Sequence, residues 1–384
     1  MTSPAPADLI YLDHNATTPI APEVLDVMLP YLRQHYGNPS SDHPLGRRAR
    51  EATETAREQV AALIGAESGE IVFTSGGTES NNLAIRGAAA AAGQGRRRIV
   101  TTSVEHPATA RPCDLLEARG WTITRLPVTR AGTLDPAAVT GALGPDVALL
   151  TVILAQNETG AIMPVPVAAA AARRHGIITH TDAAQAIGKI DVNVGTLEVD
   201  LLSIAGHKLY APKGTGALYV RAGTPLRPVL LGGGQERGLR PGTENVAGIA
   251  GLGAACALAR SRLRTEAKRL SSLRGQLWQS LSGQVPGLAR HTPMDNSLPG
   301  TLTVSFPGVL GRDVLARAHG VAASTGSACH SGMDTPSATL LAMGVPPGIA
   351  LGAVRLSLGH GSTPAGISTA ASILIRAYQE TATQ

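Results

Sequence analysis

His180-Thr-Asp182-Ala-Ala-Gln185 and Ala205-Gly-His207-Lys208 are the two stretches that decide the fold. Each follows an apolar segment typical of a buried parallel strand, Gly176-Ile-Ile-Thr179 and Asp200-Leu-Leu-Ser-Ile204. Because parallel strands end at one edge of a sheet, the pattern brings an aspartate and a lysine together where open α/β sheets bind ligands. The chain has few lysines, so one at a strand end is informative; they are Lys189, Lys208, Lys213 and Lys268.

The residue types at these strand ends indicate a particular cofactor chemistry. A carboxylate facing a ring nitrogen and a lysine able to form an imine are what pyridoxal phosphate (PLP) requires. An ordinary lysine amine titrates near about 10.4, so such a lysine needs surroundings that favour its reactive form. Alone, His207-Lys208 is more typical of a strand-end loop with a solvated cation. Asp182 and Gln185 on the neighbouring strand make a PLP site the favoured interpretation.

Length and composition predict a soluble protein of two domains, or of one large domain with a satellite. The chain has 384 residues, of which 43% are hydrophobic and 3% aromatic. Its formal charge of +5 comes with short basic clusters, Arg47-Arg48 with Arg50 and Arg96-Arg97-Arg98, that no aromatic residues interrupt. A solvated basic face is therefore expected, with an anionic ligand or acidic protein favoured over direct nucleic-acid binding.

Cysteine spacing and the apolar segments predict a cytoplasmic chain. Cys113, Cys256 and Cys329 are widely separated and form no Cys-x-x-Cys pair, which favours reduced thiols. The eleven histidines show no spacing typical of a metal site. The N-terminal residues lack the basic and apolar regions of a secretion signal, and the apolar stretch 246–259 is too short to span a bilayer. We expect no membrane association.

The order of strand-like and helical segments predicts an α/β fold with a mostly parallel central sheet. Between residues 20 and 260, strand-like runs alternate with helical ones, as in a sheet with helices on both faces. After a long charged helix at 260–281 the rhythm changes to that of a smaller α+β domain. The expected domains are 15–261 for the large one, with 1–14 and 262–384 forming the small one. The expected elements are strands at 99–102, 121–126, 147–154, 176–181, 201–204, 217–220, 300–306 and 353–358, and helices at 23–34, 47–64, 135–143, 165–174, 312–318, 335–342 and 364–378.

A glycine-rich helix start is a candidate phosphate site. Thr74-Ser-Gly-Gly-Thr-Glu-Ser-Asn-Asn82 follows the strand-like Glu70-Ile-Val-Phe73 and precedes a helical run. Glycines let the backbone approach an anion, and N–H groups at a helix N-terminus attract it. The alternative is an ordinary helix capped by Thr78.

Cys329 is the candidate nucleophile. It lies in Ser324-Thr-Gly-Ser-Ala-Cys-His-Ser-Gly332, where no bulky apolar neighbour would bury it, whereas Cys113 and Cys256 fit buried, inert thiols. A thiol with a reference pKa near about 8.5 reacts as its thiolate, so a nearby cation would assist it.

With these motifs in order, the chain resembles the cysteine desulfurases, PLP enzymes of fold type I, nearly from end to end. The matching stretches are Tyr11–Pro19, Gly37–Ser41, Gly76–Asn82, Val104–His106, Asn157–Gly160, His180–Gln185, Gly206–Lys208, Gly232–Arg237, Pro241–Asn245, the Cys329 stretch and Arg355–Gly359.

The resemblance implies a role for each cofactor-binding residue. Lys208 would carry PLP covalently, His106 would stack on its ring and move protons, Asp182 would pair with the ring nitrogen, and Gln185 would bond the phenolic oxygen. The phosphate would be bound by Gly77, Thr78 and His207, joined by Thr243 from the other subunit of a homodimer.

It also implies the substrate residues and the reaction. Asn157 and Arg355 would hold the carboxylate of L-cysteine, the arginine with two nitrogens. Cys329 would take the sulfur as a persulfide, leaving L-alanine, and pass it to an acceptor protein. Iron–sulfur assembly, tRNA thiolation and DNA sulfur modification would each use such a site, and the sequence does not choose among them.

One position departs from the family pattern and leaves alternatives open. Many members have a serine three residues before the lysine, where this chain has Ala205, which removes about 1 kcal/mol of hydrogen bonding to the phosphate. Selenocysteine lyases share the Ala-Cys-His-Ser pattern around Cys329, with Pro336-Ser337 and Met343-Gly-Val-Pro346 downstream. A class V aminotransferase and a non-catalytic scaffold are the remaining alternatives, which the Cys329 stretch and the intact site residues disfavour.

Overall fold

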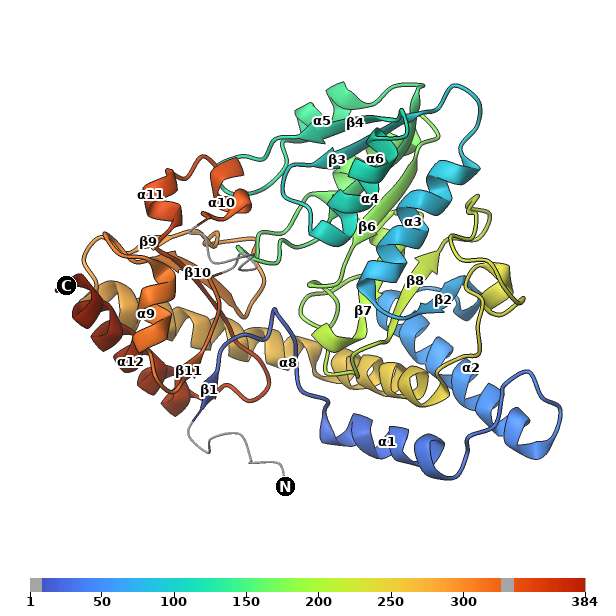
Figure 1. Ribbon diagram of the computed structural model, residues 1–384, viewed down its shortest axis with the longest axis horizontal. Helices are drawn as coiled ribbons and strands as arrows, with labels where there is room; N and C mark the ends of the chain where they lie inside the picture. Colours follow the sequence, from blue (N-terminus) through green and yellow to red (C-terminus); the bar gives the residue numbers. More distant parts are fainter. Residues whose placement is uncertain (1–8, 326–334, 384) are drawn as a thin grey trace.

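A seven-stranded sheet forms the centre of the larger part of the molecule. The computed structural model describes residues 9–325 and 335–383. The strand order is β2-β8-β7-β6-β5-β3-β4. Figure 1 shows β3 and β4 towards one edge of this sheet and β8 and β2 towards the other. Only β8 runs antiparallel to its neighbours, β2 and β7, so the predicted mostly parallel sheet is confirmed. The strands are β2 (Ile71–Thr74), β3 (Arg98–Thr102), β4 (Thr122–Leu126), β5 (Val147–Ile153), β6 (Ile178–Asp182), β7 (Leu201–Ala205) and β8 (Gly216–Val220).

Helices cover both faces of this sheet. Successive strand residues point to opposite sides of the sheet, and because both sides carry apolar side chains, both need a covering layer. Leu201 packs into the hydrophobic cluster under α3 and α4, whereas Leu202 packs with residues of α2, α6 and α8 on the other face. Leu149 and Leu150 of β5 divide in the same way. The helices are α1 (Pro22–Arg33), α2 (Pro44–Ile64), α3 (Gly77–Ala91), α4 (Pro107–Glu117), α5 (Pro136–Ala142), α6 (Val165–Arg173), α7 (Val194–Leu197) and α8 (Val246–Gln284), with the short 3-10 turns η1 (Ser68–Glu70), η2 (Gly206–Lys208) and η3 (Glu236–Gly238).

A second, antiparallel sheet with its own hydrophobic core forms the smaller part. Its strands follow the order β12-β10-β9, and a separate pair joins β1, near the start of the chain, in parallel to β11. Leu302 and Leu356 of this sheet pack with Leu277 of α8 and Leu374 of α12. The elements are β1 (Ile10–Tyr11), β9 (Ala289–Arg290), β10 (Thr301–Ser305), α9 (Gly311–Arg317), β11 (Val321–Ala322), α10 (Ala338–Ala342), α11 (Pro347–Ala350), β12 (Ala353–Ser357) and α12 (Pro364–Ala382).

Helix α8 runs through both parts and begins earlier than predicted. The expected start at 260 is wrong, because the preceding run of glycines, alanines and valines is itself helical from Val246. Small residues suit that half, since a Cβ on Gly253 would lie 2.6 Å from the backbone of Ala56 in α2. The proposed boundary between 261 and 262 therefore lies inside this helix. Among the described residues α8 is the one helix long and apolar enough to cross a membrane, yet 56% of that stretch is buried within the protein, as in a core helix.

The predicted helix at 335–342 is shorter in the structure. Ser337 has extended backbone and its hydroxyl accepts a hydrogen bond from Leu340 N at 3.1 Å, which makes it the N-cap of α10. Because Ser337 is the N-cap, the helix begins at Ala338 and not at residue 335.

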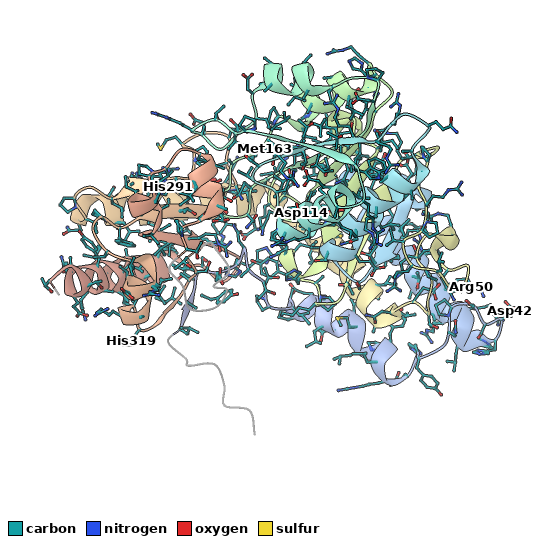
Figure 2. All side chains as sticks on the ribbon, turned by 45° about the horizontal axis from the view of Figure 1, so that its top comes forward. Asp42, Arg50, Asp114, Met163, His291 and His319 are labelled. Carbon is teal, nitrogen blue, oxygen red and sulfur yellow. The ribbon has the colours of Figure 1, made fainter. Side chains whose placement is uncertain are left out.

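Side chains around the basic clusters are engaged with the protein itself. Arg98 pairs with Asp146 at 2.8 Å, and Arg96 donates to the carbonyls of Val147 and Gly176. At the edge of the molecule Arg50 lies beside Asp42, 3.4 Å away, as Figure 2 shows. These arginines therefore stabilise loops of the protein through ion pairs and hydrogen bonds.

Candidate active site

The structure brings Asp182 and Lys208 to the same edge of the large sheet. Asp182, the last residue of β6, pairs with Ser203 of β7, and β7 ends two residues later in the turn η2 that carries Lys208. The Lys208 amine donates to the backbone carbonyls of Asn15 and Ala16, at 2.6 and 2.7 Å. Burial, with the Arg355 cation adding, lowers the pKa of Lys208 to about 8, which increases the share of neutral amine.

Asp182 is a buried carboxylate that lacks a cationic partner among the described residues. Only 3% of the residue is exposed. Its oxygens accept hydrogen bonds from Ala184 N at 3.0 Å and from the Asn81 amide at 2.7 Å. Because burying a carboxylate is costly unless it is compensated, this arrangement suits a ligand that carries a positive charge to it.

His106 stands at the start of α4 with one ring nitrogen engaged. Its Nδ1 accepts from Ala108 N at 3.1 Å, which leaves Nε2 for a ligand. Burial lowers the pKa of His106, and the nearby Asp182 carboxylate partly opposes this shift. The ring is therefore a neutral group close to Asp182 and Lys208 near pH 7.

The glycine-rich start of α3 leaves its first backbone groups accessible. The helix begins at Gly77 with Gly76 as its N-cap and no side-chain cap, so the alternative of a Thr78 cap is wrong. Gly76 has φ of 143°, which favours glycine, and a Cβ on Gly77 would lie 3.1 Å from the Ala205 side chain. Thr78 is exposed beside them. Such a cradle of N–H groups at a helix N-terminus fits a phosphate.

His207 and Gln185 lie beside Lys208, as the sequence predicts. His207 Nδ1 is hydrogen-bonded to the Thr17 hydroxyl at 3.1 Å, and burial lowers the pKa of His207 to about 4, so the ring is neutral at pH 7. The Gln185 amide donates to the carbonyl of Asn15 at 2.9 Å. The same carbonyl accepts from Lys208.

Arg355 is hydrogen-bonded to Asn157, and the acceptor is the backbone carbonyl of Asn157. Arg355 donates to the Asn157 carbonyl at 3.1 Å and to the Asp13 carboxylate at 2.8 Å. Its Nε is buried without a partner among the described residues. The guanidinium is therefore oriented by the protein and keeps an unused donor, which suits a substrate carboxylate.

Asn15 joins several residues of the site, and the sequence did not predict a role for it. Its side chain donates to the Asn157 carbonyl at 3.2 Å and to Thr301 Oγ1 at 2.9 Å, while its backbone N donates to Ser357 Oγ at 2.9 Å. It lies in the Tyr11–Pro19 motif quoted above, and that motif was the only available signal.

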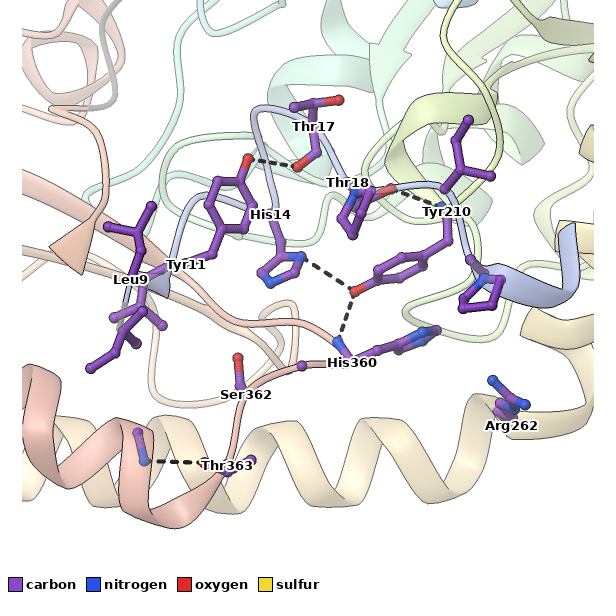
Figure 3. A pocket seen from close by; sticks show the side chains of 18 of the residues that line it. Leu9, Tyr11, His14, Thr17, Thr18, Tyr210, Arg262, His360, Ser362 and Thr363 are labelled. Carbon is purple, nitrogen blue, oxygen red and sulfur yellow. Dashed lines mark hydrogen bonds between the residues drawn. The ribbon is translucent and has the colours of Figure 1, made fainter. Parts of the chain in front are cut away.

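A pocket lined by His14, Tyr210 and His360 lies along the segment that carries Asn15. Further hydrogen bonds beside this pocket hold the segment in place. The Tyr11 hydroxyl donates to the Thr17 carbonyl at 2.9 Å, and Tyr210 N donates to Thr18 Oγ1 at 2.9 Å. Both bonds are drawn in Figure 3. These bonds hold the backbone of the segment against Lys208.

One predicted site residue, Thr243, is not brought to this cluster within the described part of the chain. Thr243 is exposed in the loop before α8 and its side chain makes no hydrogen bond within the described ranges. Cys329 lies outside the described residues. Before the stretch that contains Cys329, the backbone of Ser324 forms an isolated β-bridge with Arg355. After that stretch, the hydroxyls of Ser337 and Thr339 donate to the Glu158 carboxylate at 2.6 and 2.9 Å.

The other two cysteines are buried, as predicted. Cys113 lies within α4 and Cys256 within α8, and burial raises the pKa of both thiols to about 12. Neither thiol is suited to act as a nucleophile at neutral pH.

The fold and the site place the chain in the class V aminotransferase family of PLP-dependent enzymes. The family profile described as aminotransferase class-V matches residues 10–369. The chain is 46% identical to a cysteine desulfurase of Trichormus azollae over 361 residues, which cover 94% of this chain and 90% of the relative. It belongs to the cysteine desulfurase family.

Solved structures support the same assignment. A NifS-like protein superposes with a TM-score of 0.90 at 35% identity, over 98% of this chain and 100% of that one. A structure described as SspA in complex with cysteine superposes with a TM-score of 0.81 at 35% identity, over 91% of this chain and 98% of that one. The predicted fold type is thereby confirmed.

The residues present fit PLP. Its phosphate matches the N-terminus of α3, where Gly77 leaves room that a Cβ would occupy, and its ring nitrogen matches the buried Asp182, which has no cation of its own among the described residues. The amine of Lys208, with its lowered pKa, matches the aldehyde.

Proposed function

We propose that this chain binds PLP at Lys208 and works in the cytoplasm as a cysteine desulfurase. It would convert L-cysteine to L-alanine and pass the sulfur first to Cys329 and then to an acceptor protein. The observation that carries the cofactor assignment is the meeting of Lys208, with its lowered pKa, and the buried Asp182 at one sheet edge. The family membership carries the assignment to cysteine.

Each side chain around the cofactor would have a distinct task. PLP, when bound, would supply an electron sink for the α-carbon of the substrate. Asp182 would keep the ring nitrogen protonated, since its buried carboxylate gains a cation in doing so. Lys208, released by the substrate amine, would move the α-proton with His106. Gln185 would donate to the phenolic oxygen.

The substrate would be held between the large sheet and the small part of the molecule. Arg355, oriented by Asp13, would bind the carboxylate with its unused donor, and Asn157 would assist it. The Cys329 thiolate would attack the substrate sulfur, so that the carbon–sulfur bond breaks and the new sulfur–sulfur bond forms a persulfide. Thr243, exposed in the single chain, would reach the phosphate of its partner in a homodimer.

Cofactor loading should depend on pH through Lys208. With a pKa of about 8, roughly one amine in ten is neutral at pH 7, against fewer than one in a thousand for an ordinary lysine. Only the neutral amine attacks an aldehyde, so we expect the rate of PLP attachment to the cofactor-free protein to rise with pH and to level off above about 8. Stopped-flow absorbance measures this rate, with Lys208→Ala as the blank. A rate that still rises steeply towards pH 10.5, the ordinary value, would contradict the assigned environment.

Product analysis tests the proposed reaction against its neighbours. Purified protein loaded with PLP is given L-cysteine or L-selenocysteine with a reductant, and alanine, sulfide or selenide, and keto acid are measured. We expect equal amounts of alanine and sulfide from cysteine. A keto acid without alanine would indicate an aminotransferase, turnover of selenocysteine alone would indicate a lyase, and a failure of purified protein to bind PLP would indicate a scaffold.

A further inference from the structure

A second lysine, Lys189, lies next to the site and has no task in the proposed reaction. Its amine donates to Gln185 Oε1 at 2.7 Å and to Asn15 Oδ1 at 2.9 Å. Within residues 9–325 and 335–383, no carboxylate lies within ion-pair distance of it. Burial lowers its pKa well below the ordinary value, and the Lys208 and Arg355 cations add to this effect. A half-buried lysine without a counter-ion is costly, which calls for a reason.

The two bonds of Lys189 determine which way the Gln185 amide points. An amide has an oxygen that only accepts and a nitrogen that only donates. Gln185 Oε1 accepts from Lys189, and Nε2 donates to the Asn15 carbonyl at 2.9 Å. The flipped amide would set two carbonyl oxygens against each other and two donors against each other. Only one orientation is therefore favourable.

This orientation places a donor beside the amine of Lys208. The Asn15 carbonyl accepts from Gln185 Nε2 and also from Lys208 Nζ at 2.6 Å, so the two nitrogens share one oxygen. The second hydrogen of Gln185 Nε2 remains available for a ligand attached to Lys208.

Lys189 orients the Asn15 amide by the same logic. Because Asn15 Oδ1 accepts from Lys189, its Nδ2 is directed at the Asn157 carbonyl, 3.2 Å away, which in turn accepts from Arg355. One lysine thus joins the cofactor side and the substrate side of the site.

We propose that Lys189 is a positioning residue that selects the donating end of Gln185 for the phenolic oxygen of PLP. The proposal rests on the proposed function in one respect, that PLP is attached to Lys208. A donor at that oxygen withdraws electron density from the attached nitrogen and lowers its proton affinity. Without Lys189 the amide keeps only the Asn15 contact to fix its orientation, so the flipped form becomes more populated and the attached nitrogen becomes more basic.

The pH titration of the Lys208-bound cofactor, followed by its absorbance, tests this proposal. In Lys189→Met, which keeps the length of the side chain but removes the donor, we expect the midpoint to move up by about one pH unit. Lys189→Gln keeps a donor without the charge and should retain the midpoint of the unaltered protein. Lys268→Met, on the exposed face of α8, is the matched control and should leave the midpoint unchanged. The charged or titratable groups near Lys208 that all three variants retain are Asp13, Asp182, Arg355, His106 and His207.

A double variant separates action through Gln185 from a direct effect of charge. Gln185→Leu alone should shift the midpoint as Lys189→Met does, and the pair together should shift it no further. An unchanged midpoint in Lys189→Met, a shift in Lys189→Gln equal to that in Lys189→Met, or additive shifts in the double variant would overturn the proposal. Absence of a Lys208-dependent absorbance band in the unaltered protein would overturn the proposed function as well.

Discussion

Replacing Cys329 by alanine is expected to abolish sulfur release from L-cysteine while the absorbance of the Lys208-bound cofactor persists. The thiol would be the only acceptor of the substrate sulfur, because burial raises the pKa of Cys113 and Cys256 to about 12. Loss of a nucleophile typically lowers turnover by roughly 10³-fold or more. Sulfide release and the visible spectrum, measured on one sample, check both parts of this expectation.

Lys208→Ala serves as the comparison for that variant. It removes the amine that would hold the cofactor, so both the absorbance band and turnover should disappear. Cys256→Ala should leave turnover intact as a control for cysteine loss, since Cys256 lies within α8. Full turnover in Cys329→Ala would show that the sulfur leaves without this thiol.

Replacing Glu236 by alanine is expected to lower the free energy of unfolding by about 3–5 kcal/mol. Glu236 and Arg57 form a bidentate pair with both contacts at 2.8 Å, and their side chains are only 2% and 7% exposed. Glu236 also accepts from Phe73 N at 2.8 Å, in the strand that leads to the Gly76-Gly77 cradle. Its loss would leave the Arg57 cation buried without that partner.

A second carboxylate on the same arginine supplies the control. Glu54 contacts Arg57 at 3.2 Å but is 55% exposed, so Glu54→Ala should cost about 1 kcal/mol or less. Urea unfolding of the cofactor-loaded protein compares the three chains. Equal losses in the two variants would contradict the role of burial.

The sequence predicted the sheet and the strand-end residues well, because both depend on local patterns. Apolar runs mark β6 and β7, and the residues that follow them must meet at one edge when the strands are parallel. Asp182 and Lys208 were therefore predictable as neighbours. The start of α8 was not, since a Gly- and Ala-rich run is a weak helix signal until α2 packs against it.

The contacts of Asn15 and Lys189 could not be read from the sequence for a different reason. Asn15 meets Lys208 across 193 residues, and no pattern of local spacing encodes such a distance. Lys189 follows Gln185 by four residues, but its lack of a counter-ion among the described residues appears only when the chain is folded. Ala205 shows the converse. Its departure from the family pattern is plain in the sequence, whereas its position, where it would crowd a Cβ at Gly77, is known only from the structure.

The most direct test of the central claim is mass spectrometry of the PLP-loaded protein after a single exposure to L-cysteine without reductant. We expect the peptide that contains Cys329 to gain the mass of one sulfur atom, with one equivalent of alanine released, and we expect reductant to remove this mass. Alanine or keto acid formed while that peptide keeps its original mass would contradict that claim.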